Sequence, residues 1–310
     1  SEGENANRGG LAVALAAALR ASNGLWFGWS GEQTDEFTGQ ISFRRADGVS
    51  TATIDLEAQD IDEYYNGFAN RTLWPLFHYR LDLTEIARDF AGGYARVNHR
   101  FAETVGPLIE PDDLVWVHDY HLLPLGQQLR ERGFRNRIGF FLHIPWPPPS
   151  LLISLPDHRE LVESLLDYDV VGFQSDEWRQ AFMDYVTAHL DAEIDGEIVS
   201  FGERRTRVLV CPIGLDTADF CSAAHTMAAK QAQTQLMVSA VGRDMIVGVD
   251  RLDYSKGLQE RFIAYQQFLT NHPELCEKVS LLQIAPPSRG DVPSYQQIRA
   301  ELNALSGSIN

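Results

Sequence analysis

The chain reads L-V-W-V-H at Leu114–His118, I-G-F-F-L at Ile138–Leu142 and D-V-V-G-F at Asp169–Phe173, and these stretches decide the fold. Helical apolar spacing follows each of them, at Leu122–Arg132, His158–Leu166 and Trp178–Leu190. Short apolar strands that alternate with helices are typical of a parallel sheet covered on both faces. The sequence therefore predicts an α/β fold.

The segment before these units has turn and helix signals of its own. Asp47-Gly48, a strong hairpin dipeptide, separates two strand-like stretches, Ile41–Arg45 and Val49–Leu56. Helical spacing follows and continues through Tyr65. We expect Pro75 to interrupt this helix, because proline removes a backbone donor and clashes with the preceding turn.

A second α/β domain is expected after the first. Arg207–Val210 is predicted as the last strand of the first domain, and Cys211-Pro212-Ile213-Gly214 leads into a polar stretch without strong pattern. We place the boundary there, with residues 1–214 in the first domain and 215–310 in the second. The second domain is predicted to contain strands at Met245–Val249 and Val279–Ala285 and a helix at Pro293–Leu305.

Composition and charge exclude several classes of protein. The 310 residues have a net charge of -17, from 26 basic and 43 acidic side chains, so neither nucleic acid nor an anionic membrane is an expected partner. The three cysteines form no C-x-x-C pair, which favours reduced thiols in the cytoplasm. The early apolar run Leu11–Leu19 is too short to span a bilayer. Neither a Walker A loop nor G-x-G-x-x-G is present, which disfavours an ATPase and a dehydrogenase.

The second domain begins with a motif that suggests a phosphate site. Val247–Leu258 reads V-G-V-D-R-L-D-Y-S-K-G-L, an apolar strand followed by Arg251 and Lys256 and then by a helix. Cations and a helix N-terminus beyond a strand's carboxyl end converge on anions in α/β domains. The alternative is a surface loop in which Asp250 and Asp253 neutralise the cations.

Polar residues also follow the other strands. Asp119, Tyr120 and His121 come directly after the first strand, His143 and a proline-rich turn after the second, and Gln174 and Ser175 after the third. In the second domain, Arg289 follows Pro286-Pro287 at the end of a strand. Ligands of doubly wound sheets bind at these carboxyl ends, so the set predicts a functional site, although His121 also fits a helix cap.

Two further patterns bear on the ligand. Asp167-Tyr168-Asp169 matches the D-x-D of metal-dependent sugar transferases, but it precedes its strand and so lies at the wrong end of the sheet. We interpret it as a structural loop and expect no metal. Residues 25–31 and 64–75 combine Trp and Tyr with Gly, Asn and Ser, which suits either a core or a platform for sugar rings.

With these blocks assembled, the chain resembles the trehalose-6-phosphate synthases, retaining glycosyltransferases of the two-Rossmann-domain (GT-B) type. The resemblance implies two Rossmann-like, doubly wound parallel-sheet domains that face a cleft, with the second domain incomplete. The matching segments, in the family's order, are residues 9–13, 25–31, 62–75, 116–124, 138–145, 167–174, 249–258 and 285–291.

The resemblance implies transfer of glucose from a nucleotide sugar, usually UDP-glucose, to the 1-position of glucose 6-phosphate, with no metal and no cofactor. Roles follow for nine residues. Five of them would contact the donor: Gly9 and Gly10 would let the backbone approach it, Arg251 and Lys256 would hold its diphosphate, and His143 would contact the transferred glucose. Those on the acceptor are Tyr65, Trp74, Asp119 and Arg289, with Arg289 facing the phosphate. His143, Asp119, Arg251 and Lys256 are the expected catalytic set.

The resemblance also implies two family parts beyond the chain: a first strand with a phosphate-binding arginine, and a later acidic segment that binds the donor. Three points stay open at the level of sequence. A relative that uses another phosphorylated acceptor, of the glucosylglycerol-phosphate or validoxylamine type, is one alternative, although Tyr65, Trp74 and Asp119 favour glucose 6-phosphate. A catalytically silent sugar-phosphate sensor is another, although Arg251, Lys256 and His143 are all retained. Assembly into a homo-oligomer is also compatible with the sequence.

Overall fold

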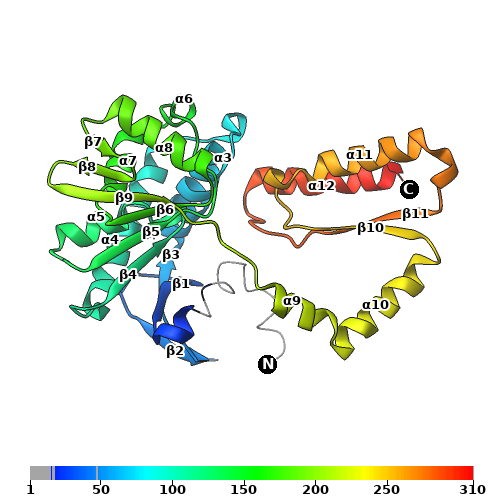
Figure 1. Ribbon diagram of the computed structural model, residues 1–310, viewed down its shortest axis with the longest axis horizontal. Coiled ribbons are helices and arrows are strands. Elements are labelled where there is room, and N and C mark those ends of the chain that lie inside the picture. The colour runs from blue at the N-terminus through cyan, green and yellow to red at the C-terminus, as the bar shows by residue number, and fades with distance from the viewer. Residues whose placement is uncertain (1–14, 16–17, 47, 310) are drawn as a thin grey trace. The chain divides into compact units, whose positions relative to one another are not determined.

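The computed structural model describes residues 15, 18–46 and 48–309, which form two compact units (Figure 1). Unit 1 is Ser1–Cys211 and unit 2 is Pro212–Asn310, a division close to the predicted boundary after Gly214. Gly9 and Gly10, the predicted backbone contacts to the donor, lie outside the described residues.

Unit 1 contains a six-stranded sheet of order β4-β5-β6-β9-β8-β7. The strands are β4 Leu114–His118, β5 Arg137–Phe141, β6 Val170–Phe173, β9 Arg204–Val210, β8 Ile198–Phe201 and β7 Glu193–Asp195. The first four are parallel, which confirms the predicted α/β sheet. The antiparallel strands β8 and β7, which were not predicted from the sequence, extend its edge.

Helices and a buried turn form the core around this sheet. The helices are α4 Arg88–Val105, α5 Leu125–Glu131, α6 Pro149–Leu152, α7 His158–Leu165 and α8 Asp176–His189. Trp146, in the proline-rich turn after β5, is fully buried and packs edge-on against Phe77, Phe173 and Phe182. Burial of such an aromatic cluster contributes several kcal/mol, on the order of 2 to 3 for each ring. This packing fixes the turn that follows β5.

A second, three-stranded sheet of unit 1 has the order β1-β3-β2. β2 Ser42–Ala46 and β3 Val49–Glu57 pair antiparallel, which confirms the predicted hairpin, and Gly48 at its turn has a φ of 76°. β1 Leu25–Thr34 runs parallel to β3 and carries the first aromatic segment. Ala52, Ile54 and Leu56 alternate along β3 and are fully buried.

The helical segment after β3 differs from the prediction. It consists of α2 Ala58–Asp60, the π-helix η1 Ile61–Leu73 and α3 Trp74–Phe77, so Pro75 does not interrupt it. Pro75 lies in the first turn of α3, where a missing backbone N–H costs least. The buried Asp60 forms ion pairs with Arg96 and Arg100 of α4 and so joins the two helices.

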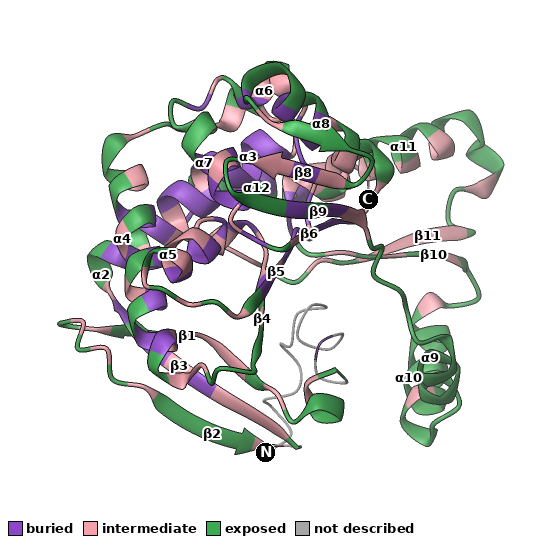
Figure 2. Cartoon of the chain, turned by 60° about the vertical axis from the view of Figure 1, so that its left-hand side comes forward, coloured by how far each residue is buried: buried purple, intermediate pink, exposed green. Residues whose placement is uncertain are grey.

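Unit 2 contains a parallel pair of strands, β10 Asp244–Val249 and β11 Val279–Ile284, which agrees with the prediction. Its helices are α9 Thr217–Ala224, α10 Met227–Ala240, α11 Leu258–Asn271 and α12 Pro293–Ile309, with 3-10 turns η5 Tyr254–Lys256 and η6 Pro273–Leu275. α9 and α10, in the stretch predicted to lack pattern, bury no residue, and Figure 2 shows them largely exposed. A small core of Leu252, Leu258, Ile298 and Leu302 joins the strand-end loop to α11 and α12.

Candidate functional site

Asp119, directly after β4, has an unusual backbone conformation. Its φ and ψ are 69° and 170°, a region that non-glycine residues rarely occupy and that costs on the order of 1 to 3 kcal/mol. Two hydrogen bonds hold it: the Asp119 N–H donates to the Phe141 carbonyl at 2.8 Å, and the His143 N–H donates to Asp119 Oδ1 at 3.3 Å. The predicted acceptor residue and the predicted donor residue are therefore adjacent at the ends of β4 and β5.

Aromatic side chains connect this position to the other two predicted acceptor residues of unit 1. The Tyr65 ring stacks on His121 at 5.7 Å and meets Trp29 edge-on at 5.2 Å. The Trp74 ring lies 5.6 Å from that of Tyr120. Tyr65 and Trp74 thus pack against the two residues that follow Asp119. Trp74 is only 4% exposed, so most of its ring belongs to the core and it offers a ligand an edge at most.

The residues beneath this cluster are held by hydrogen bonds between η1, α4 and the turn η4 Tyr120–Leu122. The Tyr120 hydroxyl donates to Asn70 Oδ1 at 2.9 Å, and the Tyr94 hydroxyl donates to the Tyr120 carbonyl at 2.7 Å. All three side chains are buried. Buried polar groups that are paired in this way fix side-chain positions, so the end of β4 is rigid.

His143 has a partner that the sequence analysis did not single out. Its Nε2 lies 3.1 Å from Nδ1 of His118, the last residue of β4. Burial lowers the pKa of both imidazoles to about 4, and for His118 the neighbouring His143 adds to the effect. Both rings are therefore neutral at pH 7, so one nitrogen of the pair donates and the other accepts.

The residues after β6 have a structural explanation. Ser175 Oγ accepts a hydrogen bond from the Trp178 N–H at 3.4 Å, which makes Ser175 the N-cap of α8. A serine N-cap stabilises a helix by about 1 kcal/mol without any ligand. Ser175 therefore has a structural role at the end of β6, whether or not a ligand binds there.

In unit 2 the predicted phosphate-binding cations follow β10 and β11. Arg251 is half exposed, Lys256 is exposed, and Gly257, with a φ of 61°, is the N-cap of α11. Of the two acidic residues in the surface-loop alternative, Asp250 pairs with Arg261 at 2.7 Å, whereas Oδ2 of Asp253 lies 3.9 Å from Arg251 Nη2. The arrangement offers a cationic strand end and a helix N-terminus to an anion.

Arg289, the predicted acceptor-phosphate residue, also has a positive φ, of 51°. Its side chain is 7% exposed, and Nη1 lies 3.3 Å from Oδ2 of the buried Asp253. Nη1 also donates to the Tyr295 hydroxyl, which in turn donates to Asp253 Oδ2 at 2.9 Å. Asp253 and Tyr295 were not predicted as site residues.

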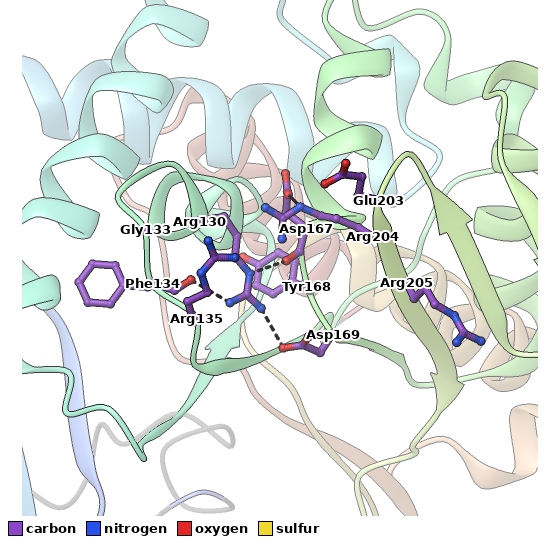
Figure 3. Close-up of a pocket in the computed structure, with 10 residues that line it drawn as sticks. All are labelled: Arg130, Gly133, Phe134, Arg135, Asp167, Tyr168, Asp169, Glu203, Arg204 and Arg205. Carbon is purple, nitrogen blue, oxygen red and sulfur yellow. Dashed lines mark hydrogen bonds and ion pairs between the residues drawn. The ribbon is translucent and has the colours of Figure 1, made fainter.

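The D-x-D stretch lines a cavity of about 550 Å³ at the opposite, amino-terminal edge of the unit 1 sheet. Figure 3 shows its carboxylates already engaged by arginines. Asp169 pairs with Arg130 at 2.9 Å, and Asp167 pairs with Arg204. Both carboxylates of the stretch therefore pair with arginines of unit 1. Within the described ranges, no group of three or more His, Cys, Asp or Glu side chains could hold a metal ion.

Comparison with known proteins identifies the family to which the chain belongs. A family model described as Glycosyltransferase family 20 matches residues 2–310. The chain belongs to glycosyltransferase family 20. It is 47% identical over 310 residues to a trehalose-6-phosphate synthase from Cronobacter sakazakii, covering 99% of this chain. The chain spans 65% of the length of that relative.

Solved structures of high similarity to this family 20 chain carry ligands. One is an alpha,alpha-trehalose-phosphate synthase (UDP-forming) from Burkholderia xenovorans in complex with glucose-6-phosphate, with a TM-score of 0.90 and 43% identity over 97% of this chain and 68% of that chain. Another, from E. coli, is bound with UDP-2-fluoro glucose, with a TM-score of 0.92 and 43% identity over 98% of this chain and 67% of that chain. These likenesses confirm the GT-B fold class. Among the described residues, no helix is both long and apolar enough to cross a membrane.

Proposed function

We propose that this protein transfers glucose from UDP-glucose to glucose 6-phosphate, forming trehalose 6-phosphate and UDP. The observation that carries the proposal is the set of cations at the carboxyl ends of β10 and β11, Arg251, Lys256 and Arg289. An acidic chain that concentrates cations at strand ends is suited to phosphorylated ligands. The relatives bound to glucose-6-phosphate and to a UDP-glucose analogue support this choice of substrates.

The chemistry follows from where charge develops. As the bond from the sugar to the diphosphate breaks, the sugar becomes oxocarbenium-like and negative charge grows on the departing phosphates. Arg251 and Lys256 stabilise that charge, and fixed cations can do so without a metal. His143, neutral at pH 7, contacts the transferred glucose by a hydrogen bond that needs no change of protonation.

Acceptor recognition is assigned to Tyr65, Trp74, Asp119 and Arg289, as the resemblance implies. Asp119 would accept hydrogen bonds from sugar hydroxyls, and its rigid setting aims the carboxylate. Attack from the face that the leaving group vacates would retain the configuration of the sugar. Three exposed, unbridged cysteines fit a reducing cytoplasm, where both substrates would be encountered.

The direct test is a substrate panel with the intact protein. UDP-, ADP- and GDP-glucose are each combined with glucose 6-phosphate and with glycerol 3-phosphate, and the product is identified by anomeric NMR. We expect an α,α-linked product from UDP-glucose and glucose 6-phosphate, at a rate that EDTA leaves unchanged. A preference for glycerol 3-phosphate, or binding of glucose 6-phosphate without turnover, would identify one of the other two functions instead. Loss of activity with EDTA and its recovery with magnesium would contradict the metal-free mechanism.

A further inference from the structure

Asp253 is fully buried, and it lies between the segments that carry all three cations. Oδ2 of Asp253 is 3.3 Å from Arg289 Nη1 and 3.9 Å from Arg251 Nη2. A buried carboxylate is stable only when cations and hydrogen bonds compensate its charge. Here the compensating groups are the two arginines assigned to phosphates of different substrates.

Tyr295 of α12 connects the carboxylate to Arg289 a second time. Its buried hydroxyl accepts a hydrogen bond from Arg289 Nη1 and donates one to Asp253 Oδ2 at 2.9 Å. Burial raises the pKa of this phenol far above its usual value, so the hydroxyl keeps its proton and remains a donor. Arg289, Tyr295 and Asp253 therefore form a closed triangle of hydrogen bonds.

The same aspartate also shapes the turn that carries Lys256. Asp253 Oδ1 accepts from the Ser255 N–H at 2.9 Å, and the Asp253 carbonyl accepts from the Lys256 N–H at 3.1 Å. This turn, η5, ends at Lys256, and α11 begins at Leu258. The carbonyl bond would form with any residue at position 253, whereas the Oδ1 bond to the Ser255 N–H lets the Asp253 side chain shape the turn that carries Lys256.

We propose that Asp253 is the positioning residue that sets Arg251, Lys256 and Arg289 together, so that one carboxylate arranges the donor-diphosphate and acceptor-phosphate subsites. The assignment of the two subsites rests on the proposed function. Arg289 is nearer to Asp253 than Arg251 is, and it has the additional Tyr295 bridge, so the acceptor-phosphate subsite depends on Asp253 more strongly.

A simpler role for Asp253 would be to neutralise charge, and two variants separate the possibilities. Asp253→Asn removes the charge and keeps an oxygen for the Ser255 N–H. Tyr295→Phe leaves every charge in place and removes only the bridging hydroxyl. If Asp253 merely screened the cations, Asp253→Asn would strengthen anion binding and Tyr295→Phe would have no effect. If it positions them, both variants weaken binding.

The experiment measures KM for each substrate and kcat in the intact protein, with Asp250→Asn as the matched control. Asp250 directly follows β10 and is also a carboxylate paired with an arginine, but its partner, Arg261 of α11, has no assigned ligand. We expect Asp253→Asn and Tyr295→Phe to raise KM for glucose 6-phosphate about tenfold, the effect of one hydrogen bond to a charged group. Asp253→Asn should also raise KM for UDP-glucose, whereas Tyr295→Phe should not. In Tyr295→Phe kcat should change less than KM, since the lost hydroxyl bridges Asp253 to Arg289 of the acceptor-phosphate subsite, whereas Asp253→Asn should also lower kcat through Arg251 and Lys256.

A second readout does not depend on transfer. Inorganic phosphate alone and pyrophosphate alone are titrated calorimetrically into each variant, whose fold is checked by circular dichroism. We expect phosphate to bind more weakly to both variants and pyrophosphate more weakly to Asp253→Asn. Unchanged or tighter binding in both variants, or the same loss in Asp250→Asn, would overturn the positioning role. If these binding losses appear in a protein that makes no trehalose 6-phosphate, the proposed function fails and the positioning role stands.

Discussion

At the scale of single residues, Arg251 and Lys256 are assigned to the leaving diphosphate. We predict that Arg251→Ala and Lys256→Ala each lower kcat by roughly 10² to 10³, as removal of one preorganised charge-stabilising group does elsewhere. Lys256 is exposed, so its loss should leave the thermal unfolding midpoint nearly unchanged, whereas loss of Arg251 also removes one of the two arginines that compensate the buried Asp253 and should lower the midpoint. Initial rates at saturating substrate and a thermal melt of each variant measure the two effects.

Lys230→Ala is the control for these two substitutions. Lys230 is an exposed lysine of α10, so the variant loses a positive charge far along the chain from the strand-end motif. Its rate should equal that of the wild type. Near-normal turnover in Arg251→Ala or Lys256→Ala would mean that the diphosphate binds elsewhere.

The contrast between the predicted and the missed site residues has a physical reason. Asp119 and His143 could be predicted because each directly follows an apolar strand, and the strand pattern alone tells which edge they occupy. His118 and Asp253 could not, because their importance comes from partners 25 and 36 positions away, His143 and Arg289. Such pairings depend on how strands and loops are brought together, which residue types do not reveal.

At the scale of elements, replacing either of two neighbouring glycines of α4 by alanine should change the stability of the protein, and the two changes should have opposite signs. A Cβ on Gly93 would lie 2.3 Å from Glu63 Cβ of η1, whereas a Cβ on Gly92 would meet nothing within 4 Å. Gly93→Ala should therefore force α4 and η1 apart and destabilise the protein by about 1 to 3 kcal/mol. Gly92→Ala should stabilise it by about 0.5 to 1 kcal/mol, because alanine favours a helix interior. Urea unfolding of both variants tests this.

The consequences should extend to function, because η1 also carries Tyr65. Gly93→Ala should raise KM for glucose 6-phosphate, and Gly92→Ala should leave it unchanged. Equal unfolding free energies of the two variants would show that α4 and η1 can move apart to accommodate the added methyl group without loss of stability, and would contradict the prediction.

Elements were predictable where burial gave them a pattern. The parallel strands of unit 1 were found from their apolar runs, and the hairpin of β2 and β3 from Asp47-Gly48. β7 and β8 were missed because β7 is exposed and has little apolar character, although Asp195-Gly196 is a similar turn signal. The apolar spacing of residues 61–73 predicts an ordinary helix, because this spacing does not distinguish the rare π-helix from an α-helix over 13 residues.

At the scale of the whole molecule, the buried histidine pair gives a prediction for stability against pH. In the unfolded chain a histidine binds a proton near pH 6.5, whereas His118 and His143 in the folded protein do so only near pH 4. Between these values the unfolded state binds more protons, so stability must fall as the pH falls. The contribution of the neutral histidine pair to the unfolding free energy is complete above about pH 6.5 and is lost progressively as the pH falls toward 4.

Acidic residues also titrate in this range. The contribution of the histidine pair is distinguished from theirs by comparing how far the unfolding free energy falls with pH in the wild type and in a variant without the pair. We predict that His118→Gln loses about 1 kcal/mol less unfolding free energy between pH 7 and pH 5 than the wild type, since partial exposure and coupling reduce the full effect. His272→Gln, at an exposed position of unit 2, measures what loss of an imidazole does outside the pair. Urea unfolding of the three proteins at both pH values gives the six free energies needed. If His118→Gln and the wild type lose the same stability, or if His272→Gln reproduces the change, the low pKa of the pair does not govern acid stability.

A neutral pair also predicts that the titration of these two histidines causes no change in kcat between pH 6 and pH 8, because neither changes charge there.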